Sequence, residues 1–283
     1  MSRSMSTILV IAEKEVREGL RNRWVLATTL LLATLALSLT FLGSAPTGTV
    51  GASALDVVIV SLSSLSVFLV PLIALLISHD AVVGEMERGT MLLLLSYPVK
   101  RWQVVVGKFL GHLAILAFST LVGYGVAAAA LAFSPGGTGG GDIGRESWAA
   151  FASLIGSSIL LGAVFIAIGY LVSALVGERG TAGGIAIGIW LVFVLVYDMA
   201  LLGLLVVDQG RTVTGEMLNV LLLLNPTDAY RLINLGGTTG AISGMGGVAD
   251  IATLAPAALL AALLAWAAIP LAAAILVFSR REL

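Results

Sequence analysis

The sequence predicts an all-α integral membrane protein that forms one transmembrane domain over residues 1–283 and crosses the bilayer six times. Hydrophobic residues make up 59% of the chain and charged residues only 11%, whereas soluble domains carry about 25% charged residues. The mean hydropathy is +1.07. Six apolar runs each approach the length of about 20 residues that a helix needs to cross the hydrocarbon core.

The positions of these runs, and of the breakers between them, give the predicted spans. The spans cover residues 24–43, 57–78, 108–133, 148–176, 180–204 and 255–279. The first run ends at the breaker region around Pro46 and Gly48, and the third ends before the glycine-rich stretch 134–142. The short turn 177–180 joins the fourth and fifth runs, so we expect these two spans to be antiparallel neighbours.

Glycines recur every four residues at the start of the fifth predicted span, at Gly180, Gly184 and Gly188. Small residues at this spacing let helix backbones approach closely within a membrane. The pattern indicates a tightly packed bundle, either within one chain or between two copies of it.

Residues 6–23 precede the first span and have the periodicity of an amphipathic helix. The apolar positions, which recur every four residues, are Ile8, Ala12, Val16 and Leu20. The charged positions on the other face are Glu13, Lys14, Arg17, Glu18 and Arg21. This pattern predicts an interfacial helix that lies along the membrane surface, and the alternative is an ordinary solvated leader helix.

The densest charge in the interior of the sequence lies between the second and third predicted spans. The charged residues there are Asp80, Glu85, Glu87, Arg88, Lys100, Arg101 and Lys108. We interpret residues 79–101 as a docking segment for another protein.

Local signals predict a short helix within this segment. Asp80 can cap the helix, and Glu85 and Glu87 fall in its early turns, where the positive end of the helix dipole favours carboxylates. Gly89 can end the helix. Pro98 then breaks the apolar run that follows.

The distribution of lysine and arginine predicts the orientation, because cytoplasmic loops of membrane proteins carry an excess of both. An even number of spans puts both termini on one side, together with segments 79–107 and 177–180. Twelve of the 15 basic residues lie on that side, and only Arg145, Arg211 and Arg231 lie on the other. Both termini and the docking segment are therefore predicted to be cytoplasmic.

The longest segment on the opposite side, residues 205–254, is predicted to hold two short helices. Residues 216–224 are apolar after the first position, apart from Asn219, but too short to cross a membrane. A Gly/Ser/Thr-rich tract, 236–247, leads back toward the sixth span. We interpret the helices as a platform for an external partner, and the alternative is a connecting loop with incidental helicity.

The second of these helices has a strong start signal. Asn225 stands at the cap, Pro226 at the first helical position and Asp228 in the first turn. The sequence predicts a helix over residues 226–235 that stops at the glycines that follow.

The chain lacks the common catalytic motifs. It contains no phosphate-binding loop of the form GxxxxGK followed by Ser or Thr, no HExxH and no Gly-x-Ser-x-Gly elbow. It has no cysteine, and its net charge is −1. We therefore expect no enzymatic activity, no metal site, no cofactor held by this chain and no nucleic-acid partner.

Few ionisable or soft side chains fall inside the predicted spans. Asp198 is the only carboxylate there, about 27 Å along the fifth span at 1.5 Å per residue, which predicts an interfacial position rather than a proton relay. Met199 is the only methionine in a span. Since copper ions prefer Cys, Met and His ligands, the sequence indicates no copper path through this chain.

One motif after the second span resembles permeases of the ABC-2 type. The residues that carry the resemblance are Gly84, Glu85, Glu87, Gly89 and Thr90, followed by Pro98 and Gly107-Lys108-Phe109. In that family the segment is the coupling helix, which sits in a groove of a separate cytoplasmic ATPase that binds ATP and Mg. The resemblance implies an ATPase-coupling role for Asp80, Gly84, Glu85, Glu87, Arg88, Gly89 and Thr90.

Residues 14–24, 68–112 and 221–235 resemble, more narrowly, permeases of the bacterial inner membrane that mature the copper sites of nitrous oxide reductase. This resemblance implies a second copy of the chain, a NosF-like cytoplasmic ATPase and a NosD-like periplasmic protein. It implies export of a sulfur species or mechanical work on the periplasmic protein. The residues expected to bind that protein are Asn225, Pro226, Asp228, Tyr230 and Arg231.

Two other functions remain open at this stage. A general ABC-2 exporter of a lipid or drug would share the coupling motif but need no periplasmic partner. A membrane-embedded scaffold or enzyme without an ATPase would share only the spans.

Overall fold

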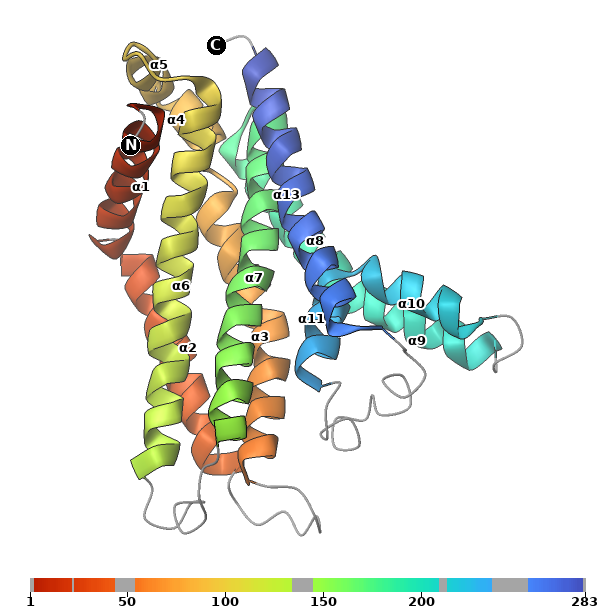
Figure 1. The fold of residues 1–283 in the computed structure, drawn as a ribbon. Coiled ribbons are helices and arrows are strands. Elements are labelled where there is room, and N and C mark those ends of the chain that lie inside the picture. Colours follow the sequence, from red (N-terminus) through yellow and green to blue (C-terminus); the bar gives the residue numbers. More distant parts are fainter. Residues whose placement is uncertain are drawn as a thin grey trace.

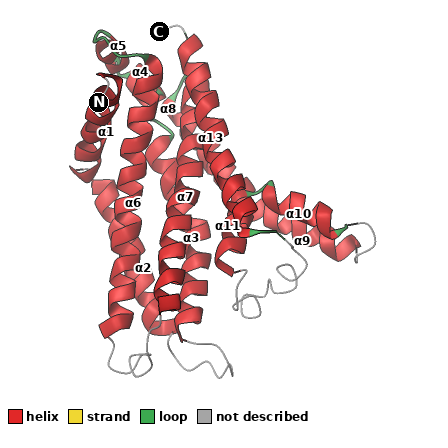
Figure 2. Ribbon diagram, viewed as in Figure 1, coloured by secondary structure: helices red, strands yellow, loops and turns green. Residues whose placement is uncertain are grey.

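The computed structural model describes residues 3–21, 23–43, 54–133, 145–208, 213–235 and 254–281. Every regular element within these ranges is a helix (Figure 2). The elements are α1 (Arg3–Arg21), α2 (Arg23–Gly43), α3 (Ala54–Ser78), α4 (Val83–Glu87), α5 (Thr90–Leu95), α6 (Arg101–Phe133), α7 (Arg145–Leu175), α8 (Arg179–Leu191), the π-helical turn η1 (Val192–Val196), α9 (Tyr197–Asp208), α10 (Gly215–Leu223), α11 (Pro226–Leu235) and α13 (Pro256–Arg280). The predicted breaker region at Pro46 and Gly48, the stretch 134–142 and the tract 236–247 lie outside the described residues.

Five segments of the described chain are long and apolar enough to cross a membrane. They are Val58–Glu87, Arg101–Ala130, Trp148–Leu175, Arg179–Asp208 and Pro256–Arg280. A sixth qualifies when α1 and α2 are taken as one pair, and these two helices are bent by 69° against each other. The predicted all-α membrane class is therefore confirmed.

Helix α1 packs lengthwise on the first half of α6. Two glycines of α6 allow this approach, because a Cβ atom at Gly107 would lie 2.8 Å from the Cβ of Ile11, and one at Gly111 would lie 2.5 Å from the Cβ of Glu15. The predicted helix is present, but Leu20, expected on the apolar face, is exposed, and the buried face includes the carboxylate of Glu15. The position of α1 along a membrane surface stays a prediction.

Helix α7 lies at the centre of the bundle, between α3 and α13 (Figure 1). Its contact with α3 is closest at Gly169, where an added Cβ atom would lie 2.0 Å from Ser78 Oγ. Only glycine fits this position without displacing α3, so the contact fixes the end of α3 from which the α4–α5 segment begins.

Both ends of the described chain lie at the same end of the bundle as α4 and α5 (Figure 1). Arg101, at the start of α6, binds the C-terminal end of α13 there. Its Nη1 donates to the carbonyl oxygens of Phe278 (3.1 Å), Ser279 (3.2 Å) and Arg281 (2.6 Å). Because the last carbonyl groups of a helix have no partners within the helix, this contact caps α13 with the residue that follows the α4–α5 segment.

The fifth predicted span is a continuous segment formed by α8, η1 and α9. It begins beside α4, and α9 then projects with α10 from the side of the bundle (Figure 1). Most of its large apolar side chains are exposed, including Met199, Val206 and Val207. A long apolar face of this segment is therefore not covered by the described part of the chain.

The two predicted short helices after the fifth span are present as α10 and α11. Helix α11 has the predicted bounds, Pro226–Leu235. It does not lie on the surface of the bundle, because it packs against α3, α7 and α13.

The close approach of α7 and α3 can be tested with one methyl group. We expect Gly169→Ala to lower the free energy of unfolding by about 1–3 kcal/mol, because the new Cβ must displace the Ser78 hydroxyl. Gly156→Ala in the same helix is the matched control, since no described atom lies within 4 Å of its added Cβ. Thermal unfolding of the solubilised chain measures both, and equal unfolding temperatures would contradict the contact.

Candidate functional site

The start of α4 is capped by a side chain from α7. The backbone N–H groups of Val82 and Val83 both donate to Ser173 Oγ at 3.0 Å. The predicted cap at Asp80 is wrong, because the cap position is Val82 and the Asp80 carboxylate binds Arg179 at 2.9 Å. Ser173, on the neighbouring helix α7, therefore fills the capping role that the local sequence predicted for Asp80.

The end of α4 agrees with the sequence. Arg88 is the cap residue, and Gly89 has a φ of 70°, the left-handed conformation that glycine adopts most easily. The apolar run that follows Gly89 forms a second short helix, α5, which ends before Pro98. The docking segment thus consists of two short helices joined at Gly89.

The segment is also bonded to the turn between α7 and α8. Glu87 Oε1 accepts a hydrogen bond of 2.7 Å from the backbone N–H of Arg179, the first residue of α8. With the Asp80–Arg179 ion pair, this contact ties two of the predicted coupling residues to α8.

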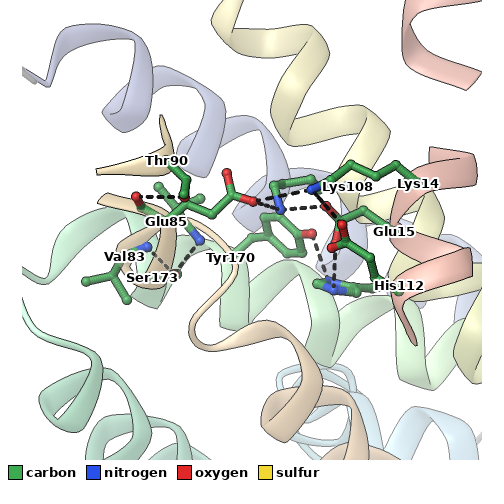
Figure 3. A network of polar contacts seen from close by, with 11 residues as sticks. Lys14, Glu15, Val83, Glu85, Thr90, Lys108, His112, Tyr170 and Ser173 are labelled. Atoms are coloured by element: carbon green, nitrogen blue, oxygen red, sulfur yellow. Dashed lines mark hydrogen bonds and ion pairs between the residues drawn. The ribbon is translucent and has the colours of Figure 1, made fainter. Parts of the chain in front are cut away.

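A buried lysine joins α4 to α1 and α6 (Figure 3). Lys108 Nζ lies 2.7 Å from Glu15 Oε1 on α1 and 2.7 Å from Glu85 Oε1 on α4. The exposed side-chain fractions are 4% for Lys108, 8% for Glu15 and 11% for Glu85. We call these three residues the buried charge triad.

Three further side chains extend the triad (Figure 3). Lys14 Nζ lies 3.7 Å from Glu15 Oε1 and 4.0 Å from Glu85 Oε1. On the other side, His112 Nε2 lies 3.6 Å from Glu15 Oε2, and the Tyr170 hydroxyl lies 2.9 Å from His112 Nδ1. The network therefore runs from the surface at Lys14 to the bundle interior at Tyr170.

The ion pairs keep the Glu15 carboxyl charged despite its burial. Burial by itself raises the pKa of Glu15, but the charge and hydrogen bond of Lys108 outweigh it, so the net pKa is below its ordinary value of 4.5. A depressed folded pKa contributes stability that is present above 4.5 and is lost as the pH falls through the folded value. The triad is therefore formed at neutral pH.

Glu15 was missed by the sequence reasoning, although a signal for it exists. It stands four residues after Ile11 and seven after Ile8, on the stripe of α1 that faces α6. A carboxylate on such a stripe indicates a buried ion pair. Its partner could not be found from spacing, because Lys108 is far away in the sequence.

The outward side of the docking segment is partly apolar. Among the predicted coupling residues, Glu87, Arg88, Gly89 and Thr90 are exposed, whereas Gly84 and Glu85 are buried. Helix α5 adds Leu92 and Leu93, and Tyr97 follows just after its end. The exposed fractions of these three side chains are 61%, 68% and 65%. We call the exposed set Glu87, Arg88, Gly89, Thr90, Leu92, Leu93 and Tyr97 the α4–α5 surface.

The residues expected to bind an external partner are not exposed. Asn225, Pro226, Asp228 and Tyr230 are buried, and the Arg231 side chain is only 14% exposed. Helix α11 enters the bundle and is covered by α3, α7 and α13, so these side chains form no outward surface in the described part of the chain. Partner binding in this region stays a prediction.

The cap of α11 agrees with the sequence and also reaches the fifth span. Asn225 Oδ1 accepts from the backbone N–H of Thr227 at 3.0 Å. Asn225 Nδ2 donates to the carbonyl oxygen of Phe193 in η1 at 3.0 Å, and Thr227 Oγ1 donates to the same oxygen at 3.2 Å. The Tyr230 hydroxyl bonds to Ser158 Oγ of α7 at 2.9 Å.

Asp198 is paired rather than isolated. Its Oδ2 accepts a hydrogen bond from Arg231 Nη1, which also donates to Asp228 Oδ1 at 3.1 Å. Within the described residues, no group of three or more His, Cys, Asp and Glu side chains is arranged to hold a metal ion.

Comparison with known proteins gives the same family as the coupling motif. Residues 9–283 match the family described as ABC-2 family transporter protein. A protein of Stutzerimonas stutzeri named "Probable ABC transporter permease protein NosY" is 48% identical over 279 residues, which cover 98% of this chain and 99% of the relative. A protein of the same name from Pseudomonas aeruginosa is 47% identical over 283 residues, 99% of this chain and 100% of the relative. The narrower resemblance predicted from the sequence, to permeases named NosY, is confirmed.

Removal of the shared lysine tests the triad. We expect Lys108→Met to lower the free energy of unfolding by about 3–5 kcal/mol, because it leaves two buried carboxylates with only the half-exposed Lys14 as a counter-charge. The neutral triple variant Glu15→Gln, Glu85→Gln, Lys108→Met should recover most of the loss. Unfolding of the solubilised protein measures both variants, and a triple variant as unstable as Lys108→Met would argue against charge as the cause.

Proposed function

The chain belongs to the ABC-2 family of transporter proteins, and on that premise we propose that it is a permease subunit driven by a separate cytoplasmic ATPase. Its task is copper-site assembly of nitrous oxide reductase. The sequence holds no GxxxxGK loop followed by Ser or Thr, so a NosF-like partner binds the ATP and Mg. The α4–α5 surface carries the proposal.

The α4–α5 surface suits a docking role because its two sides differ. Its inner side is fixed by Ser173, Arg179 and Lys108. Its outer side presents the charged Glu87 and Arg88 beside exposed apolar residues of α5. A rigid backing with apolar anchors and a polar rim is the usual composition of a protein interface.

The buried charge triad provides a route from this surface into the membrane domain. A force on α4 acts on Glu85 and, through Lys108, on Glu15. These residues belong to three elements, α4, α6 and α1. Since cores have discrete packed arrangements rather than continuous deformability, we infer that α1 and α6 move with the docking segment.

Orientation and partners complete the proposal. The end of the bundle that carries α4, α5 and both chain ends faces the cytoplasm of the bacterium, because most basic residues gather there. A second copy of the chain binds along the exposed apolar face of α8 and α9. Gly180, Gly184 and Gly188 support this contact, because no described atom lies within 4 Å of a Cβ added at any of them.

The copper-site role rests on the sequence resemblance and on the NosY-named relatives. A NosD-like protein then binds on the periplasmic side. Helix α10 offers exposed residues for this contact, including Glu216, Met217 and Val220. The ATP-driven step is export of a sulfur species or mechanical work on that protein.

Docking can be tested on α5. We expect Leu93→Glu to weaken binding of the purified NosF-like ATPase about tenfold or more, because it puts a charge where an apolar anchor is buried on binding. Leu93→Met is the matched control and should bind normally. Both variants should unfold at the parental temperature, since Leu93 is 68% exposed. Unchanged binding of Leu93→Glu would exclude α5 from the interface.

Transmission can be tested separately in cells that lack the native permease. The neutral triple variant of the triad should still bind the ATPase, because the exposed residues of the α4–α5 surface are unchanged and Ser173 and Arg179 still hold α4. We expect it to lower the copper content of nitrous oxide reductase several-fold, since α1 and α6 no longer follow α4. Full copper content with the triple variant would show that the triad only stabilises the fold.

A further inference from the structure

A compact set of hydrogen bonds and ion pairs joins helix α11 to the fifth span. The span contributes residues 193–198 and the α10–α11 region contributes residues 221–231. The Phe193 carbonyl accepts from Asn225 and Thr227, and the Tyr197 hydroxyl donates to the Leu221 carbonyl at 2.6 Å. We call this set, together with the ion pairs of Arg231, the α11 latch.

The charges of the latch do not balance. Arg231 Nη1 donates both to Asp198 Oδ2 and to Asp228 Oδ1, so one guanidinium serves two carboxylates. Both carboxylates therefore face the same guanidinium group. Asp228 is 1% exposed, and Asp198 Oδ1 is buried without a hydrogen-bond partner among the described atoms.

Among the described side chains, no other charge faces this group from the elements packed against α11. The described side chains of α3 and α7 are uncharged, and α13 carries its only charge at Arg280, its last residue. The polar groups that α7 presents are Ser157 and Ser158, which bond to Asn234 and Tyr230. On α10 the titratable group is Glu216, which is exposed, and on the fifth span the neighbour is Tyr197.

We propose that Asp228 carries a proton beside the Asp198 carboxylate, and that this proton keeps α11 fastened to the fifth span. The proton removes the excess negative charge and supplies a donor between two carboxylates that otherwise repel each other. Its loss leaves a net charge of −1 in a buried site and loosens the latch. The contact between α11 and η1 therefore responds to the pH of the solution around α11.

The electrostatics of Asp228 agree with this geometry. Helix α11 is not one of the candidate spans. Burial, and then the charge of Asp198, raise the pKa of Asp228 above its ordinary value of 3.8, and Arg231 and Asn225 oppose them only in part. A raised folded pKa contributes stability that is fully present below 3.8 and is lost as the pH rises through the folded value.

The latch meets the span at its π-helical turn. Such turns carry backbone groups outside the regular helical pattern and often mark functional positions. Here the Phe193 carbonyl accepts from two side chains, Asn225 at the cap of α11 and Thr227 in its first turn. When the latch loosens, this carbonyl loses them, so the π-helical turn between α8 and α9 becomes free to change.

The chain has no cysteine. The reactivity of a single thiol introduced into α11 therefore measures how often the latch opens. Ala229 is fully buried next to Asp228, and we would measure the rate at which N-ethylmaleimide modifies Ala229→Cys in the full-length chain in membranes. The same measurement on Ala229→Cys with Asp228→Asn, a mimic of the protonated acid, corrects for the reactivity of the thiol at each pH. The Glu18→Gln variant is the control for an exposed carboxyl, since the Glu18 side chain is 61% exposed, and it should behave as the parent.

We expect equal rates in parent and Asp228→Asn at low pH. Above the folded pKa the parent should be modified progressively faster, by about tenfold per pH unit relative to Asp228→Asn. Asp198→Asn should also abolish the pH dependence, which keeps the test decisive if Asp228→Asn folds poorly. A rate ratio that does not change with pH, or faster modification of Asp228→Asn at every pH, would overturn the proposal.

Discussion

The ion pairs of Lys108 are the constraint on which the end of the bundle that carries α4 and α5 depends. Lys108 and the two glutamates are nearly removed from water, so any one of them alone would be costly to bury. Together they fix the relative positions of α1, α4 and α6. Two residues of the α4–α5 surface, Glu87 and Arg88, follow Glu85 by two or three positions. The orientation of that surface is therefore coupled to the triad.

Helix α4 could not exist without its neighbours. It has five residues, whereas isolated helices shorter than about 12–15 residues are marginal in water. Ser173 supplies its N-terminal cap, and Glu85 anchors its middle to Lys108. Its short length thus makes its shape a property of the surrounding helices. A change in their packing would alter α4 directly.

The sequence predicted which helices form better than it predicted which residues pack around them. The apolar runs and the cap at Asn225 follow from local rules, so the spans and α11 could be located. Burial of α11 could not be foreseen, because its start signal is the same for a surface helix and for one that enters a bundle. The same limit applies to Asp80, whose capping role was taken by Ser173 from another helix. Local patterns carry no information on such partners.

The uncovered face of α8 and α9 has a consequence for purification. Lipid tails solvate an apolar helix face about as well as another protein does, so water exclusion contributes little to association there. Two copies would be held by the shape of the glycine-lined surface and by the lipids they displace. The oligomeric state should then vary with the detergent or lipid that surrounds the protein, even when every chain remains folded.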